Sequence, residues 1–214
     1  AVLRMIHDTS LPPEILPQMQ RETYTPGWIE WVKRWNACIA VQGFSDPNQD
    51  RLASFWREQQ ATICAVVERA ETLGRQLQAA DLPLVLCHAD IHTHNLLLEP
   101  SGRLWLVDWD EGVLAPRERD LMFVVGGISS KLVSPRDEAL FFIGYGQVEV
   151  NPLALAYYRC AWAVQDIGGF AERAFEMPEL GEVSKRHAAD LFMSLFEPGE
   201  IVALALNSDD KKIV

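Results

Sequence analysis

The sequence of 214 residues lacks the short motifs by which many proteins cradle a chain of phosphates. Neither G-x-G-x-x-G nor G-x-x-x-x-G-K-[ST] occurs. Lysine is also scarce, and no lysine lies in a strand expected ahead of residue 86; the five are Lys33, Lys131, Lys185, Lys211 and Lys212. This stretch of sequence therefore contains no phosphate-binding loop of a familiar type.

Positive charge is in short supply. The chain has 19 Lys and Arg against 30 Asp and Glu, which gives a formal net charge of −11 at pH 7. Because nucleic acids and anionic membrane surfaces bind basic faces, we expect neither as a partner. A cationic small molecule would be attracted to such a chain, although the same charge also favours solubility.

Long apolar runs and paired cysteines are missing as well. No stretch reaches the roughly 18 apolar residues of a membrane span, and the first ten residues lack the pattern of a secretory signal. The cysteines are widely spaced and form no C-x-x-C pair; they are Cys38, Cys64, Cys87 and Cys160. We interpret them as buried thiols in a reducing compartment, and we expect a cytoplasmic location.

Helical periodicity covers most of the chain, in which 49% of residues are hydrophobic. Apolar residues recur at three- and four-residue steps between Pro, Gly and polar breaks. The expected helices cover residues 28–39, 49–80, 135–144, 152–175 and 181–195, with a last short helix after Pro198-Gly199. Asp120 is expected to cap a further helix over residues 121–127. Residues 2–6 read as a helix already under way, and residues 11–24, with three prolines, as a loop.

Three tryptophans recur at helical spacing on the first long helix. Trp28, Trp31 and Trp35 share one face. Such a face is either a packing surface or a platform for a ligand, and the spacing alone does not distinguish the two.

Residues 86–110, LCHADIHTHNLLLEPSGRLWLVDWD, form the segment with the most chemistry. A short apolar strand over residues 84–87 leads into it. Residues 96–98 and 104–107 are expected to pair as a hairpin, because Pro and Gly lie in the intervening turn.

An acid, an amide and a second acid follow one another in this segment. Asp90 comes where the chain leaves the buried strand, Asn95 follows five residues later, and Asp108 ends the hairpin. This is the order of a kinase-type catalytic loop, in which a carboxylate accepts the proton of a hydroxyl and the Asn binds magnesium. One Asp and one Asn suit Mg²⁺, which otherwise takes phosphate oxygens and water. We therefore predict Asp90 as the base, and Asn95 and Asp108 as ligands of Mg²⁺ with ATP as co-substrate.

A zinc site is the competing interpretation of the same segment. His88, His92 and His94 have the spacing H-x₃-H-x-H, which can supply zinc ligands. That interpretation leaves Asn95 and the D-W-D run without a role.

The segment resembles the aminoglycoside phosphotransferase and choline kinase superfamily. That family reads H-G-D-x-H-x-x-N, then two strands, then D-W-[DE] and D-L. Here the matching stretches are His88–Asn95, Asp108–Asp110 and Asp120-Leu121. The HADIHTHN run and Ala115–Asp120 are most similar to spectinomycin-type phosphotransferases. Ala89 stands where Gly is usual, a mild change if its backbone angles are ordinary.

The resemblance implies roles for individual residues. Asp90 would orient or deprotonate the hydroxyl, and Asn95 and Asp108 would hold magnesium. His88 and Asp120 would brace the catalytic loop.

Asp110 and Glu111 are weaker candidates. They follow the metal Asp and would face a cationic substrate. The plainer alternative for them is a solvated pair of loop residues.

The fold expected on this basis is mainly α (α+β), the helical large lobe of a protein-kinase-like fold with one small β-hairpin that carries the catalytic loop. We expect a single lobe over residues 1–214, made of three segments: a helical substrate-side segment over 10–80, the catalytic loop, hairpin and metal Asp over 84–123, and a helical remainder over 124–214. Leu3–His7 resembles the start of the family's large lobe. The N-terminal nucleotide lobe has no counterpart in this sequence.

The expected function is ATP- and Mg²⁺-dependent phosphorylation of a hydroxyl on a small, amine-bearing molecule. An aminoglycoside or aminocyclitol antibiotic is the first candidate, which implies a role in antibiotic resistance. Choline, homoserine and a sugar are alternative substrates. A different possibility is an inactive fragment that binds a partner, or dimerises, through the face where the missing lobe would sit. Without that lobe we expect little turnover from this chain alone.

Overall fold

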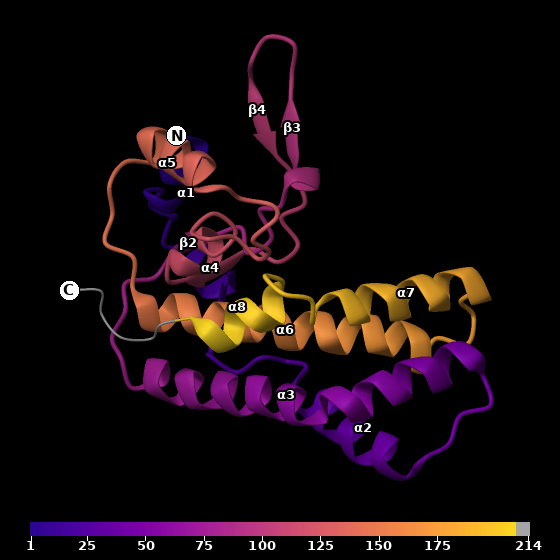
Figure 1. Cartoon of the computed structure of the whole chain (residues 1–214). Coiled ribbons are helices and arrows are strands. Elements are labelled where there is room, and N and C mark those ends of the chain that lie inside the picture. Colours follow the sequence, from indigo (N-terminus) through magenta and orange to yellow (C-terminus); the bar gives the residue numbers. More distant parts are fainter. Residues whose placement is uncertain (209–214) are drawn as a thin grey trace. The chain divides into compact units, whose positions relative to one another are not determined.

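The computed structural model describes residues 1–208 and is mainly helical, with two small sheets (Figure 1). This confirms the predicted fold class. The described residues form two compact units: unit 1 comprises residues 1–24 and 76–158, and unit 2 comprises residues 25–75 and 159–208. The predicted division of the chain as one lobe of a larger kinase stays a prediction.

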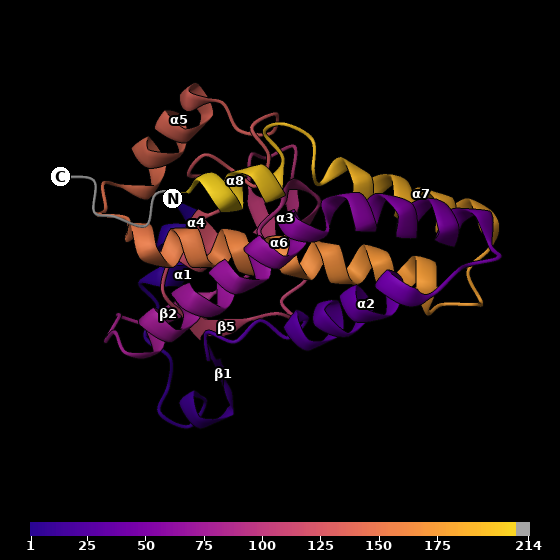
Figure 2. The same cartoon turned by 60° about the horizontal axis from the view of Figure 1, so that its bottom comes forward.

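Unit 1 contains both sheets. Its helices are α1 (Val2–His7), α4 (Glu118–Leu121) and α5 (Pro135–Tyr145), and 3₁₀ turns cover Leu16–Gln18 and Thr93–Asn95. Its strands are β1 (Gln20–Arg21), β2 (Val85–Cys87), β3 (Leu96–Leu98), β4 (Leu104–Leu106) and β5 (Val113–Ala115). In the three-stranded sheet β5 is central, parallel to β1 and antiparallel to β2, with Leu86 opposite Leu114 (Figure 2).

The β3–β4 hairpin stands out from the rest of unit 1 (Figure 1). Its pairing confirms the predicted hairpin, with Leu97 opposite Trp105. Leu97, Leu98 and Trp105 are 53%, 71% and 42% exposed. The guanidinium of Arg103 lies 3.9 Å from the centre of the Trp105 ring, so Leu97 and Leu98 are the more exposed apolar side chains of the hairpin.

One predicted helix of unit 1 is wrong. Asp120 was expected to cap a helix over residues 121–127, but the helix is α4 and Asp120 lies inside it. The Asp120 carboxylate accepts hydrogen bonds from backbone N–H groups of a distant loop, so it does not cap the residues that follow. Those residues form turns after Leu121.

Helix α5 confirms the helix predicted over residues 135–144. It begins after Ser134, whose Oγ accepts the N–H of Asp137, while the Asp137 carboxylate accepts the N–H of Ser134. This reciprocal pair satisfies two donors at the start of the helix. Tyr145 at its end packs with Leu3 of α1 and Leu121 of α4, and this small apolar cluster joins three elements of unit 1.

Unit 2 is built from helices. They are α2 (Ile29–Val41), most of α3 (Pro47–Gln78), the larger part of α6 (Pro152–Phe175), α7 (Glu182–Ser194) and α8 (Ile201–Asn207). Each agrees with a predicted helix to within a few residues. Helices α3 and α7 meet through Trp56, which stacks on Phe192 with a centroid separation of 5.3 Å. Within residues 1–208, no helix has both the length and the apolar character of a membrane span.

The tryptophan face of α2 is a packing surface. The indole N–H groups of Trp31 and Trp35 donate to Glu176, and Trp35 stacks on Phe175 at 4.5 Å. Trp28 lies against Gly168 of α6, so closely that a Cβ there would be 2.4 Å from the indole ring. The packing interpretation of these tryptophans therefore holds, and Gly168 allows the approach.

Candidate catalytic site

Asp90 is held from several directions. Its backbone N–H donates to Nδ1 of His88 at 3.3 Å, and its carbonyl accepts Nδ2 of Asn95 at 2.8 Å. The same Nδ2 donates to Oδ2 of the Asp90 carboxylate at 3.1 Å, and Nε2 of His92 lies 3.3 Å from that oxygen. The other oxygen, Oδ1, has no hydrogen-bond partner within residues 1–208. One carboxylate oxygen is thus fixed by the protein and the other is open.

Asn95 is buried at the end of the 3₁₀ turn, with its side chain directed at Asp90. Because its Nδ2 is committed to Asp90, the amide orientation is set and Oδ1 is the free acceptor. An amide oxygen in this position suits a hard cation such as Mg²⁺. The structure therefore brings two of the predicted site residues, Asp90 and Asn95, into direct contact.

Asp108 follows Val107, whose backbone N–H and carbonyl both contact residues of the catalytic loop. The Val107 N–H donates to the carbonyl of Asn95 at 3.0 Å, and its own carbonyl lies 2.9 Å from Nε2 of His88. Asp108 has a φ of +64°, a left-handed conformation that Asp tolerates better than most residues. Its carboxylate is exposed and makes no hydrogen bond or ion pair within residues 1–208.

Strain of this kind is often retained at functional sites. A carboxylate and an amide oxygen, neither with a partner within residues 1–208, are also oxygen ligands of the type that Mg²⁺ takes. The residues present therefore fit the predicted magnesium site, with Asn95 and Asp108 as the protein ligands. Their role as ligands stays a prediction.

His88 is fully buried and has a partner at both ring nitrogens. Nδ1 accepts the N–H of Asp90, so Nε2 carries the proton and faces the Val107 carbonyl. The ring also meets the indole of Trp109 edge-on, with centroids 4.7 Å apart. His88 therefore links the catalytic loop to the hairpin, and neither nitrogen is free for zinc.

Ala89 does not have ordinary backbone angles. Its φ is +72°, a region that costs a residue with a Cβ about 1–2 kcal/mol relative to Gly. The expectation that Ala in place of Gly is a mild change required ordinary backbone angles, and Ala89 does not have them. The carboxylate of Asp120 offsets the strain, because its oxygens accept the N–H groups of His88 and Ala89 at 2.9 and 2.7 Å.

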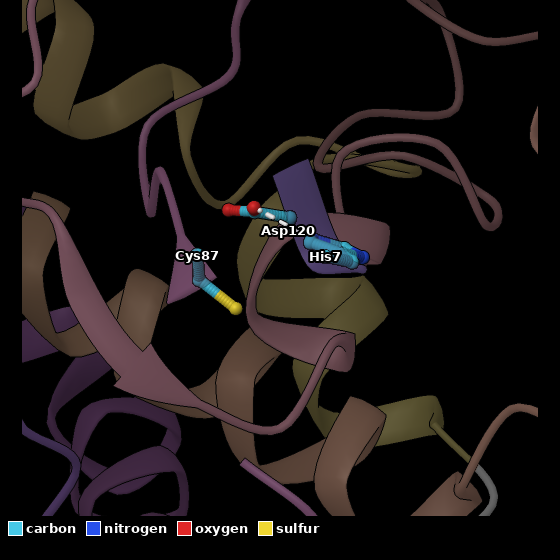
Figure 3. A group of neighbouring side chains, drawn as sticks. All are labelled: His7, Cys87 and Asp120. Atoms are coloured by element: carbon cyan, nitrogen blue, oxygen red, sulfur yellow. Dashed lines mark hydrogen bonds and ion pairs between the residues drawn. The ribbon is translucent and has the colours of Figure 1, made fainter. Parts of the chain in front are cut away.

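A buried cluster surrounds Asp120 (Figure 3). Nε2 of His7 lies 3.0 Å from Oδ2 of Asp120, and Nδ1 of His7 lies 2.6 Å from the hydroxyl of Tyr145. One ligand atom from each of His7, Cys87 and Asp120 lies within 4.8 Å of the others, and the three side chains are drawn in Figure 3. Within residues 1–208 this is the one group of three or more such side chains with metal-ligand spacing.

The cluster does not fit a metal ion. Both nitrogens of His7 and both oxygens of Asp120 already have partners. Burial and the neighbouring Asp120 charge raise the pKa of the Cys87 thiol well above its usual value. A metal ligand must be a thiolate, whereas this thiol stays protonated and contacts the carbonyls of Ala115 and Pro116. The cluster is a hydrogen-bonded anchor for the catalytic loop.

Sequence reasoning missed His7 and Tyr145 as parts of this anchor. Leu3–His7 was noted only as the start of the family's large lobe, and Tyr145 is one aromatic residue among several in α5. Neither has a partner nearby in the sequence, since His7 and Asp120 are 113 residues apart. No local spacing could have joined them.

Asp110 and Glu111 lie in the turn between β4 and β5. Both are exposed and make no hydrogen bond or ion pair within residues 1–208. The turn is closed by the Gly112 N–H, which donates to the carbonyl of Trp109 at 3.0 Å. Their proposed contact with a cationic substrate stays a prediction.

A separate cavity of about 570 Å³ lies elsewhere in unit 1 and includes none of the predicted site residues. Its wall includes Glu118, which is 4% exposed and accepts the N–H of Asn151 at 2.8 Å. Burial raises the pKa of the Glu118 carboxyl. Arg117 and Glu149 complete the charged part of the wall.

The acid–amide–acid order along this loop and hairpin is the one predicted for a kinase-type site. The comparison with protein families agrees: residues 1–154 match the model of the phosphotransferase enzyme family, and the chain belongs to that family. This confirms the resemblance to the aminoglycoside phosphotransferase and choline kinase superfamily.

Solved structures give the same answer for the fold. A spectinomycin phosphotransferase in complex with ADP and spectinomycin is 32% identical, with a TM-score of 0.83 over 98% of this chain and 64% of that one. An ethanolamine kinase from Plasmodium vivax has a TM-score of 0.57 at 14% identity, covering 92% of this chain and 57% of that one.

Matches to curated sequences are short. The 3-deoxy-D-manno-octulosonic acid kinase of Xylella fastidiosa (strain M12) is 55% identical over 29 residues, which are 14% of this chain and 12% of that protein. The corresponding kinase of Xanthomonas axonopodis pv. citri (strain 306) is 34% identical over 70 residues, 29% of this chain and 28% of that protein. The chain thus spans only a fraction of the length of each relative.

Proposed function

We propose that this chain carries the catalytic and substrate-side part of a small-molecule O-phosphotransferase that uses MgATP. The observation that carries the proposal is the geometry of Asp90. One carboxylate oxygen is fixed by Asn95 and lies near His92, while Oδ1 is open to an incoming hydroxyl. A carboxylate presented in this way can accept the proton of a hydroxyl as phosphoryl transfer proceeds.

The residues around Asp90 have two further proposed roles, magnesium binding and positioning of the loop. The free amide oxygen of Asn95 and the unpaired carboxylate of Asp108 would hold Mg²⁺. Bound there, Mg²⁺ would neutralise charge on the phosphates. His88 and Asp120 keep the loop in shape, so that the hydroxyl and the phosphate are aligned by positioning and not by covalent catalysis.

The nucleotide is bound largely by a portion that this sequence does not contain. No G-x-G-x-x-G occurs, and no lysine lies in a strand ahead of the catalytic loop. The chain covers 64% of the spectinomycin phosphotransferase that was solved with ADP. We therefore propose that an N-terminal nucleotide lobe completes the site, and that residues 1–214 alone show little turnover.

An aminocyclitol or aminoglycoside is our first proposed substrate, with antibiotic resistance as the consequence. The 32% identity to a spectinomycin phosphotransferase supports this choice, and the net charge of −11 would attract a cationic molecule. A sugar acid is the second candidate, since two 3-deoxy-D-manno-octulosonic acid kinases match over short stretches. Choline and homoserine remain further alternatives. Cys87 and Cys160 are buried as predicted, whereas Cys38 and Cys64 are only half-buried; all four are unpaired, which supports a cytoplasmic location.

The test is a substrate panel with MgATP, using the protein at its native length. The panel contains spectinomycin, several aminoglycosides, choline, homoserine and 3-deoxy-D-manno-octulosonic acid, and the phosphorylated product is identified by mass spectrometry. We expect transfer to an amine-bearing member, and loss of that transfer when EDTA removes Mg²⁺. Failure with every member, despite ATP binding, would contradict the proposal.

One observation favours a second function. The hairpin exposes Leu97 and Leu98, and an apolar surface of this kind commonly binds a partner. If the chain is an inactive binding module, it should self-associate through this hairpin. Sedimentation of the chain would then show a dimer that Leu98→Asp disperses, whereas a monomer at all concentrations removes this alternative.

A further inference from the structure

His92 occupies a defined place in the catalytic loop that the proposed mechanism has not used. It is the residue before the 3₁₀ turn, and its Nδ1 accepts the N–H of His94 at 3.2 Å. A nitrogen that accepts a hydrogen bond carries no proton, so in the neutral ring the proton is on Nε2. The loop's own backbone therefore selects one tautomer of His92.

The protonated nitrogen lies close to the predicted base. Nε2 of His92 lies 3.3 Å from Oδ2 of Asp90, and the two side chains are 35% and 26% exposed. Asn95 donates to the same oxygen at 3.1 Å. Both partners thus lie on Oδ2, and Oδ1 remains open.

We propose that His92 is a positioning residue for Asp90. In this structure Nε2 and Oδ2 are close but not hydrogen-bonded; on substrate binding His92 would donate its Nε2–H to Oδ2 and hold the carboxylate so that Oδ1 receives the substrate proton. Contacts of this kind are often long in the absence of substrate and shorten when substrate binds. His92 does not take the proton itself, because its Nδ1 is already occupied by the His94 N–H. The inference rests on the proposed function and refines it.

Two substitutions distinguish the roles of the two ring nitrogens. His92→Asn keeps an acceptor near the place of Nδ1, and Asn is a favourable residue before a helical turn, but it is too short to reach Asp90. His92→Gln keeps a donor near the place of Nε2. The exposed neighbour His94, whose ring lies 5.4 Å from that of His92, provides the matched control His94→Ala.

The kinetic test uses the protein at its native length with the substrate found in the panel. We expect His92→Asn to lower kcat on the order of 10- to 100-fold, the effect of a lost hydrogen bond to a charged group, with KM for ATP nearly unchanged. His92→Gln should restore kcat to within about threefold of the wild type, and His94→Ala should leave it unchanged. In an Asp90→Asn background, His92→Asn should have no further effect.

Equal losses in the Asn and Gln variants, or unchanged kcat in His92→Asn, would overturn the inference. If Asp90→Asn itself keeps full activity, the proposed function fails instead, whatever His92 does. The two failures are therefore distinguishable.

A second readout needs no turnover. Nitrogen-15 NMR of the imidazole rings at one fixed pH reports which nitrogen carries the proton. We expect the Nε2–H tautomer for His92, and a shift of its Nε2 signal in Asp90→Asn but not in Asp110→Asn. A mixture of tautomers, or no response to Asp90→Asn, would contradict the inference.

Discussion

At the scale of single residues, the catalytic loop combines backbone strain with unusually complete anchoring. Ala89 and Asp108 both have positive φ values, of +72° and +64°. Each lies beside a predicted functional residue or is one. The strain at Ala89 is tolerated because Asp120 binds the two neighbouring N–H groups, so the loop's shape depends on a residue 31 positions away.

Because Asp120 anchors the loop, we expect its substitution to destabilise the folded protein. In Asp120→Asn one oxygen becomes an NH₂ group facing backbone donors, and the buried N–H groups of the loop lose a charged acceptor. We expect the free energy of unfolding to fall by roughly 2–4 kcal/mol, measured by urea denaturation. The exposed Asp110→Asn is the control and should change stability by less than about 0.5 kcal/mol. Similar effects of the two changes would show that the anchor contributes little.

Glu118 gives a prediction for pH. Burial raises its folded-state pKa, so the native protein binds more protons than the unfolded chain in the interval above the ordinary carboxyl pKa. The contribution of Glu118 to stability is therefore present at low pH and falls as pH rises through that interval. Glu118→Gln removes the titration while keeping an acceptor for the Asn151 N–H.

We accordingly expect the stability of Glu118→Gln relative to the wild type to increase between about pH 4 and pH 8. Thermal or urea unfolding at several pH values measures this difference. The exposed Glu111→Gln serves as the control and should show a smaller trend. A relative stability that decreases with pH would contradict the assigned environment of Glu118.

The contact between two predicted site residues could be expected from the sequence because it is local. Asp90 and Asn95 are five residues apart, and their contact in the structure follows from one short turn. The contacts of His7 and Tyr145 with the anchor could not be predicted, because they depend on packing between α1, α4 and α5.

At the scale of elements, long helices were the most predictable part. Helices α3 and α6 have sustained apolar periodicity, and their predicted ends lie within two residues of the observed ones. Strands β1 and β5 were not predicted, because two or three residues are too few to show an alternation. They are fixed by pairing between distant segments, which local sequence does not encode.

Helix α6 continues through two adjacent glycines, Gly168 and Gly169. A Cβ on Gly168 would lie 2.4 Å from the Trp28 ring, whereas a Cβ on Gly169 would meet nothing within 4 Å. Gly168→Ala should therefore destabilise the protein by about 1–3 kcal/mol through overpacking. Gly169→Ala should stabilise it by about 0.5–1 kcal/mol, because Ala is the better helix former.

Urea unfolding of the two variants side by side measures the difference. Both substitutions add one methyl group to adjacent positions of one helix, so each is the other's control. Equal effects would mean that Trp28 does not pack closely on Gly168.

At the scale of the whole molecule, the family match supports the proposal of a small-molecule phosphotransferase, and the composition is compatible with it. The net charge of −11 argues against nucleic acid and favours a cationic ligand. The proposal of a nucleotide lobe rests on the lack of a phosphate-binding loop in residues 1–214 and on the 64% coverage of the spectinomycin phosphotransferase. The intact mass of the protein expressed from its own locus checks this: we expect a mass above 24.1 kDa by roughly 10 kDa, a small domain. A mass equal to 24.1 kDa would favour the inactive binding module.

The most direct test of the central claim is the rate of phosphoryl transfer from MgATP in Asp90→Asn, at native length and with the best substrate of the panel. We predict that kcat falls by about 10²- to 10⁴-fold, while ATP affinity and the free energy of unfolding stay close to those of the wild type. Asp81→Asn, at an exposed position outside the candidate site, should retain most of the rate. Transfer that survives in Asp90→Asn would contradict the assignment of Asp90 as the group that accepts the substrate proton.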